Sequence, residues 1–173
     1  MPIATWNTFK ENYTENKPEE ERTIQKALEH FNKFAIKPFS IVQQQDGQNH
    51  REMLHDAKLS NGETTIKIEA KTDHVSRHSG NFFIEYIQYG KASGIAITDA
   101  DYYVISDTIN YWMIDVGDLN ELIANTREAD ELKTRWNRNK DGMFIVGYVL
   151  KKSDVLEFAT VLQMLKCFLE FLK

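Results

Sequence analysis

The chain has little of several things whose abundance would classify it immediately. It holds one cysteine, so it forms no internal disulfide, which fits a reducing compartment better than an extracellular disulfide scaffold. No apolar run approaches membrane-spanning length, and the amino-terminal segment lacks the pattern of a secretory signal. We therefore expect a soluble, cytoplasmic protein that has no membrane partner.

An excess of positive charge is also missing. The 21 Lys and Arg residues are outnumbered by 26 Asp and Glu residues, and the net charge is −5. A protein that binds nucleic acid through a basic surface all around is thus excluded. Any nucleic-acid site must be a local basic patch or must use metal ions to offset the charge of its own acids. The sequence has no phosphate-binding glycine loop, and Cys167 lies in an apolar pattern that predicts a packed thiol rather than a nucleophile.

What is present is the composition of an ordinary globular domain. The 173 residues are 42% hydrophobic and 12% aromatic, with only 3 Pro and 8 Gly. These values argue against long disordered tracts and predict a real hydrophobic core. The chain shows no internal repeat or linker, so we expect a single domain over residues 1–173.

Hydrophobic periodicity predicts a mixed α/β domain with a central mixed β-sheet flanked by helices. Pro18 and the acids after it predict a helix from residue 18 to 34, with a buried stripe of Ile24, Ala27, Leu28, Phe31 and Phe34. Strands are expected at 37–45, 51–59, 64–71, 81–89, 101–106, 111–116 and 143–150. Helices are expected at 119–125 and 154–173, the latter with Ser153 as N-cap. Residues 127–142 are strongly charged, and within them 133–140 predict a solvated helix.

Two of the expected strands meet at Asn61-Gly62, which predicts a two-residue hairpin turn with Ser60 opposite Glu63. This register places Asp56 diagonal to Glu69 on one face of the hairpin. Residues two apart in a strand share a face, so Lys71 joins them, while Ile66, Ile68 and His55 point to the apolar side. His55 is therefore expected to be a packed residue.

Two carboxylates and a lysine on one face match the needs of metal-assisted phosphodiester cleavage. Carboxylate oxygens hold Mg²⁺, which activates water and stabilises the scissile phosphate, and a neighbouring lysine orients the attacking water. A solvated charged face of an antiparallel sheet produces the same alternation. Similar acid-x-Lys triplets occur at 56–58 and 131–133, so the alternation alone leaves both interpretations open.

The order of these features resembles the PD-(D/E)xK nuclease superfamily, the restriction-endonuclease-like fold. A helix with acids is followed by a strand, by Asp56 on a second strand, and by the run IKIEAKTD that contains Glu69, Ala70 and Lys71. The segments NFFIEY and KASGIAITDADYYVI are also similar to virus-encoded members, some grouped with Holliday-junction resolvases. The resemblance covers residues 18–106, with the core motif in 56–71, and it departs from the motif where His55 replaces the proline.

The resemblance implies a metal-dependent DNA endonuclease, located in the host cell cytoplasm if the source is viral. It implies that Asp56, Glu69 and Lys71 are catalytic, and that Asp56, Glu69 and the backbone carbonyl of Ala70 hold Mg²⁺ or Mn²⁺. Lys71 would position the nucleophilic water. Related enzymes often add an acid from the first helix; Glu21 is the choice here, with Glu20 as its competitor.

Other predicted site residues follow the core motif. Glu85 either completes the metal site or forms a structural ion pair. A DNA surface is predicted at His74, Arg77, His78, Asn81, Lys91 and Ser93, against the alternative of an exposed polar loop. His74 and His78 have the i, i+4 spacing of a zinc pair, but no further ligand lies nearby, which disfavours zinc.

Two further interpretations stay open at this point. The segment around Trp136, with its flanking Arg135 and Arg138, has the basic and aromatic character of a nucleic-acid surface. Residues 161–172 form an apolar run that predicts either a homodimer surface or ordinary core packing. The alternative to an enzyme is a catalytically inactive module of the same fold that binds nucleic acid or assists assembly.

Overall fold

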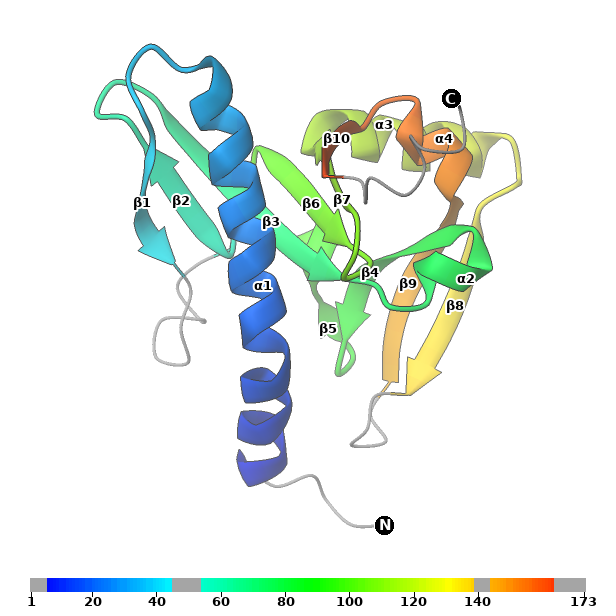
Figure 1. The fold of residues 1–173 in the computed structure, drawn as a ribbon. Helices are drawn as coiled ribbons and strands as arrows, with labels where there is room; N and C mark the ends of the chain where they lie inside the picture. The colour runs from blue at the N-terminus through cyan, green and yellow to red at the C-terminus, as the bar shows by residue number, and fades with distance from the viewer. Residues whose placement is uncertain (1–5, 45–53, 139–143, 164–173) are drawn as a thin grey trace, which may run out of the picture.

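A computed structural model describes residues 6–44, 54–138 and 144–163, with side chains described for 17–44, 54–136 and 144–162. Within these ranges the chain forms a mixed α/β fold, as the sequence predicted, built on two sheets and four α-helices (Figure 1). None of the helices in the described part is long and apolar enough to cross a membrane.

The larger sheet has six strands in the order β1-β2-β3-β6-β7-β10. They are β1 (Ser40–Gln44), β2 (Ala57–Ser60), β3 (Thr65–Thr72), β6 (Tyr102–Ser106), β7 (Tyr111–Asp115) and β10 (Thr160–Gln163). Strands β3 and β6 run parallel, and every other neighbouring pair is antiparallel. The segment between β3 and β6 is therefore a crossover, and it contains the second sheet's first two strands.

The smaller sheet has four strands in the order β5-β4-β9-β8, all antiparallel. Its strands are β4 (Asn81–Gln88), β5 (Lys91–Ala92), β8 (Lys133–Arg138) and β9 (Phe144–Lys151). The helices are α1 (Trp6–Phe34), α2 (Ser76–Ser79), α3 (Val116–Glu128) and α4 (Lys152–Leu156), with a 3-10 turn η1 (Gly94–Ala96).

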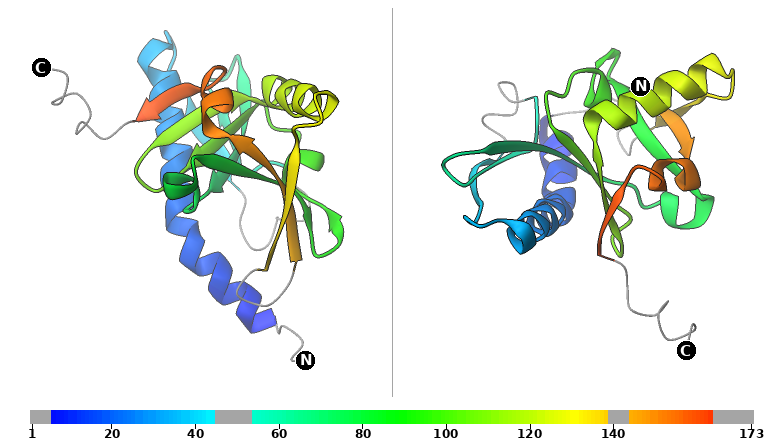
Figure 2. Two further views of the ribbon diagram at one scale, coloured as in Figure 1. Left: turned by 90° about the vertical axis from the view of Figure 1, so that its right-hand side faces the viewer. Right: turned by 90° about the horizontal axis from the view of Figure 1, so that it is seen from above.

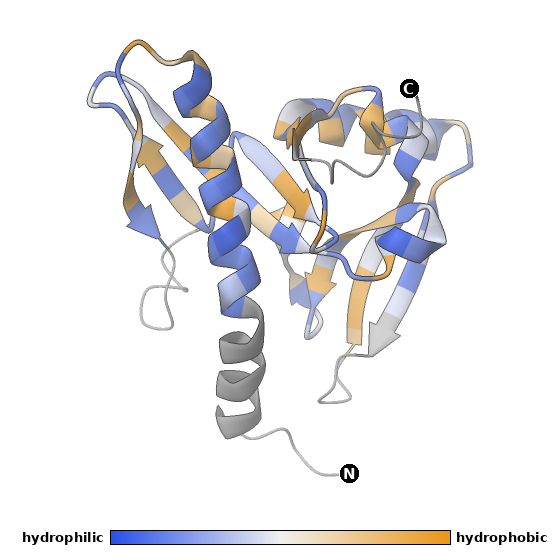
Figure 3. Cartoon of the chain, viewed as in Figure 1, coloured by the Kyte–Doolittle hydropathy of each residue, from blue (hydrophilic) through white to orange (hydrophobic). Residues whose placement is uncertain are grey.

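The two faces of the six-stranded sheet carry separate hydrophobic cores. One face packs against α1, whose Ile24 and Ala27 are fully buried over Ile68 and Val104. The other face packs against the four-stranded sheet and α3, as the two turned views show (Figure 2). Apolar residues alternate with polar ones along the strands and α1, which supplies each face with its own side chains (Figure 3).

Helix α1 begins at Trp6, so the prediction that Pro18 opens the helix is wrong. The fixed φ of proline suits a helix, and an internal proline removes one backbone hydrogen bond without forbidding helical φ and ψ. Most of the predicted stripe lies toward the sheet, but Phe34 is 77% exposed and packs edge-on against His30. The helix ends there, beyond the edge of the core that Phe31 still touches.

The β2–β3 hairpin differs from its predicted register. Ser60 pairs with Thr65 rather than Glu63, because the side chain of Asn61 accepts hydrogen bonds from the N–H groups of Glu63 and Thr64 and widens the turn. Gly62 supplies the positive φ that this turn requires. The shift is even, so every side chain keeps its predicted face.

The last third of the chain departs most from prediction. Residues 152–156 form the short helix α4, whose N-cap position is Lys151 rather than Ser153, and residues 160–163 form β10 beside β7. A continuous helix from residue 154 is therefore wrong within the described part, and Cys167 lies outside the described residues. Within the described part of the charged segment, residues 133–138 form strand β8 rather than a helix, because they pair with residues 144–149 of β9.

Candidate active site

The β2–β3 hairpin brings Asp56 against the end of β3. The ladder closes at Ala57 opposite Ile68, and the N–H of Asp56 donates to the carbonyl of Ile68 at 2.8 Å. One carboxylate oxygen of Asp56 accepts a hydrogen bond from the N–H of Ala70 at 2.7 Å. Asp56 is only 6% exposed, so its carboxylate is held inside the fold at the point where β2 leaves the edge of β3.

Glu69 and Lys71 lie side by side on β3. The Nζ of Lys71 is 2.9 Å from Oε1 of Glu69, whose side chain is 8% exposed, whereas that of Lys71 is 34% exposed. The other oxygen of Glu69 accepts from the hydroxyl of Thr98 at 3.2 Å. The pair therefore has a buried acid and a lysine that still reaches solvent, which gives an incoming molecule access to the ammonium.

The charges of the three side chains influence one another strongly. Burial alone would lower the pKa of Lys71, but the Glu69 and Asp56 carboxylates hold it well above its ordinary value. Burial, followed by the repulsion from Glu69, raises the pKa of Asp56 to about 8. Two acids thus share one lysine, and at neutral pH the metal-free site favours a proton on Asp56.

Helix α1 adds a third acid, and the structure favours Glu20 over Glu21 for this role. Burial raises the pKa of the half-buried Glu20, Lys71 opposes that rise and Glu69 adds to it, so Glu20 lies within electrostatic reach of both. Glu21 is exposed and lies 3.9 Å from Lys17. Glu19 is occupied elsewhere, because its carboxylate accepts from the hydroxyls of Ser106 and Tyr111.

Strand β4 and the turn after it supply the outer wall. Glu85 is half-buried, and its carboxylate accepts from the hydroxyl of Ser93 at 2.6 Å. Its charge raises the pKa of Lys71, which places it in the same electrostatic neighbourhood. Gly94 passes so close that an added Cβ would lie 2.5 Å from the Glu85 carbonyl, so this turn requires glycine.

His55 is buried, as predicted, but it is not merely packed. Its Nδ1 lies 2.7 Å from a carboxylate oxygen of Asp99, whose other oxygen accepts from Nζ of Lys67 at 2.6 Å. The hydrogen bond from Lys67, together with that from His55, lowers the pKa of Asp99. These hydrogen bonds connect His55, the residue before Asp56, to the loop that precedes β6, and so fix the position of Asp56.

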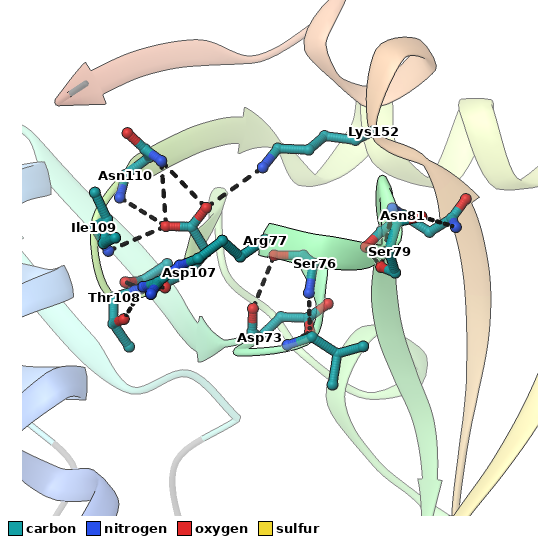
Figure 4. Close-up of polar contacts among 12 residues, drawn as sticks. Asp73, Ser76, Arg77, Ser79, Asn81, Asp107, Thr108, Ile109, Asn110 and Lys152 are labelled. Carbon is teal, nitrogen blue, oxygen red and sulfur yellow. Dashed lines mark hydrogen bonds and ion pairs between the residues drawn. The ribbon is translucent and has the colours of Figure 1, made fainter. Parts of the chain in front are cut away.

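The predicted DNA-contacting residues do not form one group. Arg77 donates to the carbonyl of Asp107 and to the hydroxyl of Thr108, so it joins α2 to the β6–β7 turn (Figure 4). The amide of Asn81 donates to the carbonyl of Ser79, and Ser93 holds Glu85, as noted above. His74, Arg77, His78 and Lys91 are exposed, whereas Asn81 and Ser93 are half-buried.

A divalent cation suits the donors that the site provides. Hard cations such as Mg²⁺ take few protein oxygens and keep several waters, and Asp56 and Glu69 supply buried carboxylate oxygens. The N–H and C=O of one residue point to the same side of an extended strand, so the carbonyl of Ala70 lies on the side of β3 where its N–H meets Asp56. The described residues contain no cluster of three or more acid, histidine or cysteine side chains already disposed to hold one metal ion.

Sequence reasoning missed Thr98, Asp99 and Tyr103. All three lie on the segment KASGIAITDADYYVI, but hydroxyl and aromatic residues beside a strand carry no spacing rule that links them to a motif 30 positions earlier. The parallel pairing of β3 with β6, which sets Tyr103 beside Glu69, is what unites them. One feature of the sequence could have indicated them. A strand that returns after a crossover lies parallel to the first strand, so residues of β6 come to lie beside the motif on β3.

Comparison with models of protein families, with curated proteins and with solved structures gave no match to this chain.

Proposed function

We propose that the protein is a metal-dependent DNA endonuclease of the restriction-endonuclease-like fold, which hydrolyses phosphodiester bonds with Mg²⁺ or Mn²⁺. The observation that carries the proposal is the ion pair between buried Glu69 and partly exposed Lys71, with buried Asp56 beside it. A purely solvated charged face would not bury two carboxylates. Burial and, after it, the repulsion from Glu69 raise the pKa of Asp56, and a bound cation would offset both effects.

The order of elements agrees with this fold. Helix α1 packs on a sheet in which β1, β2 and β3 are antiparallel, and β6 returns parallel to β3 after a crossover. The acids lie where the pairing of β2 with β3 ends, and the Asp56 carboxylate accepts a hydrogen bond from the next N–H of β3, that of Ala70. The Lys71 side chain, which is 34% exposed, would be the first part of the site to meet a phosphate, while the sheet behind it stays packed.

In the proposed reaction Asp56, Glu69 and the carbonyl of Ala70 would hold the cation, and Glu20 would add negative charge from α1. When bound, the cation supplies positive charge to the scissile phosphate and lowers the pKa of water. The Lys71 ammonium, fixed by Glu69, orients the attacking water and offsets charge that develops on the phosphate. The bond to the leaving oxygen breaks opposite the attacking water, by in-line displacement.

A second candidate, a catalytically inactive module that binds DNA or assists assembly, is favoured by one observation. Both oxygens of Glu69 and one of Asp56 already accept hydrogen bonds or ion pairs from Lys71, Thr98 and Ala70. In such a module these bonds would be structural and would not yield to a cation.

Cleavage distinguishes the two candidates. Supercoiled, single-stranded, flapped and four-way-junction DNA are incubated with Mg²⁺ or Mn²⁺ and wild-type protein, Lys71→Ala or Asp56→Ala. The endonuclease proposal expects cleavage of at least one substrate by the wild type and its loss in both variants. Cleavage that survives both changes would remove the site assignment, and no cleavage of any substrate would support the inactive module. Preference for a four-way junction would require a homodimer, since two strands must be cut in matched positions.

A further inference from the structure

One polar group beside the candidate site has no role in the proposed reaction. Tyr103 lies on β6, in register with Glu69 on the parallel neighbour β3, so the two side chains stand on the same face of the sheet. Its side chain is fully buried, at 0% exposure. The hydroxyl has no hydrogen-bond partner among the described residues. A buried hydroxyl without a partner costs free energy, so most such groups in folded proteins are bonded to protein or to water.

The surroundings of this hydroxyl are those of the site. Burial raises the pKa of Tyr103, Lys71 opposes the rise, and Glu69 and Glu85 add to it. The phenol oxygen therefore lies within electrostatic reach of the lysine and of acids on two different strands. Tyr102, the preceding residue on β6, points to the opposite face, where it packs against Phe31 of α1.

Two of these neighbours have hydrogen-bonding capacity to spare. The Lys71 ammonium carries three N–H donors and uses one on Glu69. The Glu85 carboxylate accepts from Ser93 through Oε1, and its second oxygen is not used by that bond. A water that meets a hydroxyl, an ammonium and a carboxylate finds the two to four partners that an ordered internal water needs.

We propose that Tyr103 is a positioning residue of the candidate site, whose hydroxyl shares an ordered water with Lys71 and Glu85. The water fixes the second donor of the ammonium, so that the remaining donor points to the solvent side where a phosphate arrives. Tyr103 acts through Lys71 and does not touch the substrate, since it is wholly buried. The inference rests on the proposed function for its catalytic consequence but not for the hydrogen-bond arrangement itself.

The test uses Tyr103→Phe, which removes the hydroxyl and keeps the ring, with Tyr102→Phe as the matched control on the same strand. Heteronuclear NMR of the lysine side-chain ammonium groups follows proton exchange at Lys71 without requiring activity. We expect exchange at Lys71 to accelerate at least ~3-fold in Tyr103→Phe and to stay unchanged in Tyr102→Phe, since a lost bond frees the ammonium to solvent. Equal exchange rates in the two variants would overturn the inference.

Kinetics add a second arm. With an active wild type, Tyr103→Phe should lower kcat about 10-fold, the scale of an outer hydrogen-bond partner, and leave KM unchanged. If Tyr103→Phe changes exchange at Lys71 although the wild type cleaves nothing, the hydrogen-bond arrangement stands and the proposed function is refuted. If Tyr103→Phe does not fold, a crystal structure of the wild type decides: a water within hydrogen-bond distance of the phenol oxygen and Lys71 is expected, and a phenol oxygen surrounded by apolar atoms alone would contradict it.

Discussion

The ammonium of Lys71 lies 2.9 Å from the carboxylate of Glu69, and the two residues stand on one face of β3 with Asp56 beside them. The pair combines a buried acid with a lysine that reaches solvent. On a solvated surface both partners of an ion pair are exposed and contribute little to stability, so the burial of Glu69 distinguishes this pair from such a surface.

Lys71→Ala tests the role of the lysine. We expect a loss of cleavage of about 100-fold or more, because one preorganised donor to developing charge contributes on this scale. The matched control is Lys58→Ala, on the neighbouring strand β2 of the same hairpin. Single-turnover cleavage rates compare the two, and equal losses would show that the effect is not specific to the lysine beside Glu69.

Asp56→Asn tests the burial of the acid through stability. In the unfolded chain Asp56 has its ordinary pKa of 3.8, and in the folded protein about 8, so the folded state binds the extra proton between these values. Stability of the metal-free protein therefore falls as pH rises from about 4 to about 8, since the unfolded state binds fewer protons. Thermal unfolding in EDTA should show this fall in the wild type and a smaller one in Asp56→Asn. A pH profile that is identical in both proteins would contradict the buried, repelled carboxylate, and the exposed Asp118 supplies the control Asp118→Asn.

Glu20→Gln and Glu21→Gln form a matched pair one position apart on α1. Because Glu20 lies in the field of Lys71 and Glu69, its neutral variant should lower the cleavage rate about 10-fold, as for other outer residues of a metal site. Glu21→Gln should match the wild type, since that acid faces Lys17. Titration of Mn²⁺ binding by electron paramagnetic resonance checks the same order of effects. A larger effect of Glu21→Gln would return the role to Glu21.

Asp107→Ala tests what holds the β6–β7 turn. The Asp107 carboxylate is 1% exposed, accepts from the N–H groups of Ile109 and Asn110, and lies 3.4 Å from Nζ of Lys152 (Figure 4). Breaking such a buried pair should lower the free energy of unfolding by about 3 kcal/mol. Burial would raise the pKa of Asp107, but the bonds from Asn110 lower it, so this contribution is present at neutral pH and is lost as pH falls through the lowered pKa.

Urea unfolding at pH 7 measures this loss, and Glu157→Ala, at an exposed position of the same region, is the control. A loss no larger than that of Glu157→Ala would mean that the turn is held by Arg77 and the backbone instead.

The sequence predicted the α/β class, most strands and the convergence of Asp56, Glu69 and Lys71. The convergence survived a wrong register because the widened turn at Asn61 shifts the pairing by an even step. The alternation of side chains along a strand determines which face each one occupies, and the turn determines only which residues of the two strands lie opposite each other. The choice between Glu20 and Glu21 was beyond the sequence, since neighbours on a helix differ by about 100° in direction and the orientation of α1 comes from packing.

Other failures have physical reasons too. The apolar Val161 and Leu162 fit a helix or a strand, and pairing with β7 decides for the strand. The charged residues of β8 would suit a solvated helix, but pairing with β9 satisfies the backbone hydrogen bonds of β8 equally well. In both segments the secondary structure is determined by pairing with a strand distant in the sequence, which no local sequence pattern predicts.

Cleavage by Glu69→Gln, compared with Glu63→Gln, tests the central claim most directly. Glu63 lies in the turn of the same hairpin and its side chain is 73% exposed, so its variant controls for lost charge. Each protein is incubated with the DNA panel in Mg²⁺ and in EDTA. The account predicts metal-dependent cleavage by the wild type and Glu63→Gln, and none by Glu69→Gln. Cleavage by Glu69→Gln at the wild-type rate, or wild-type cleavage that persists unchanged in EDTA, would contradict it.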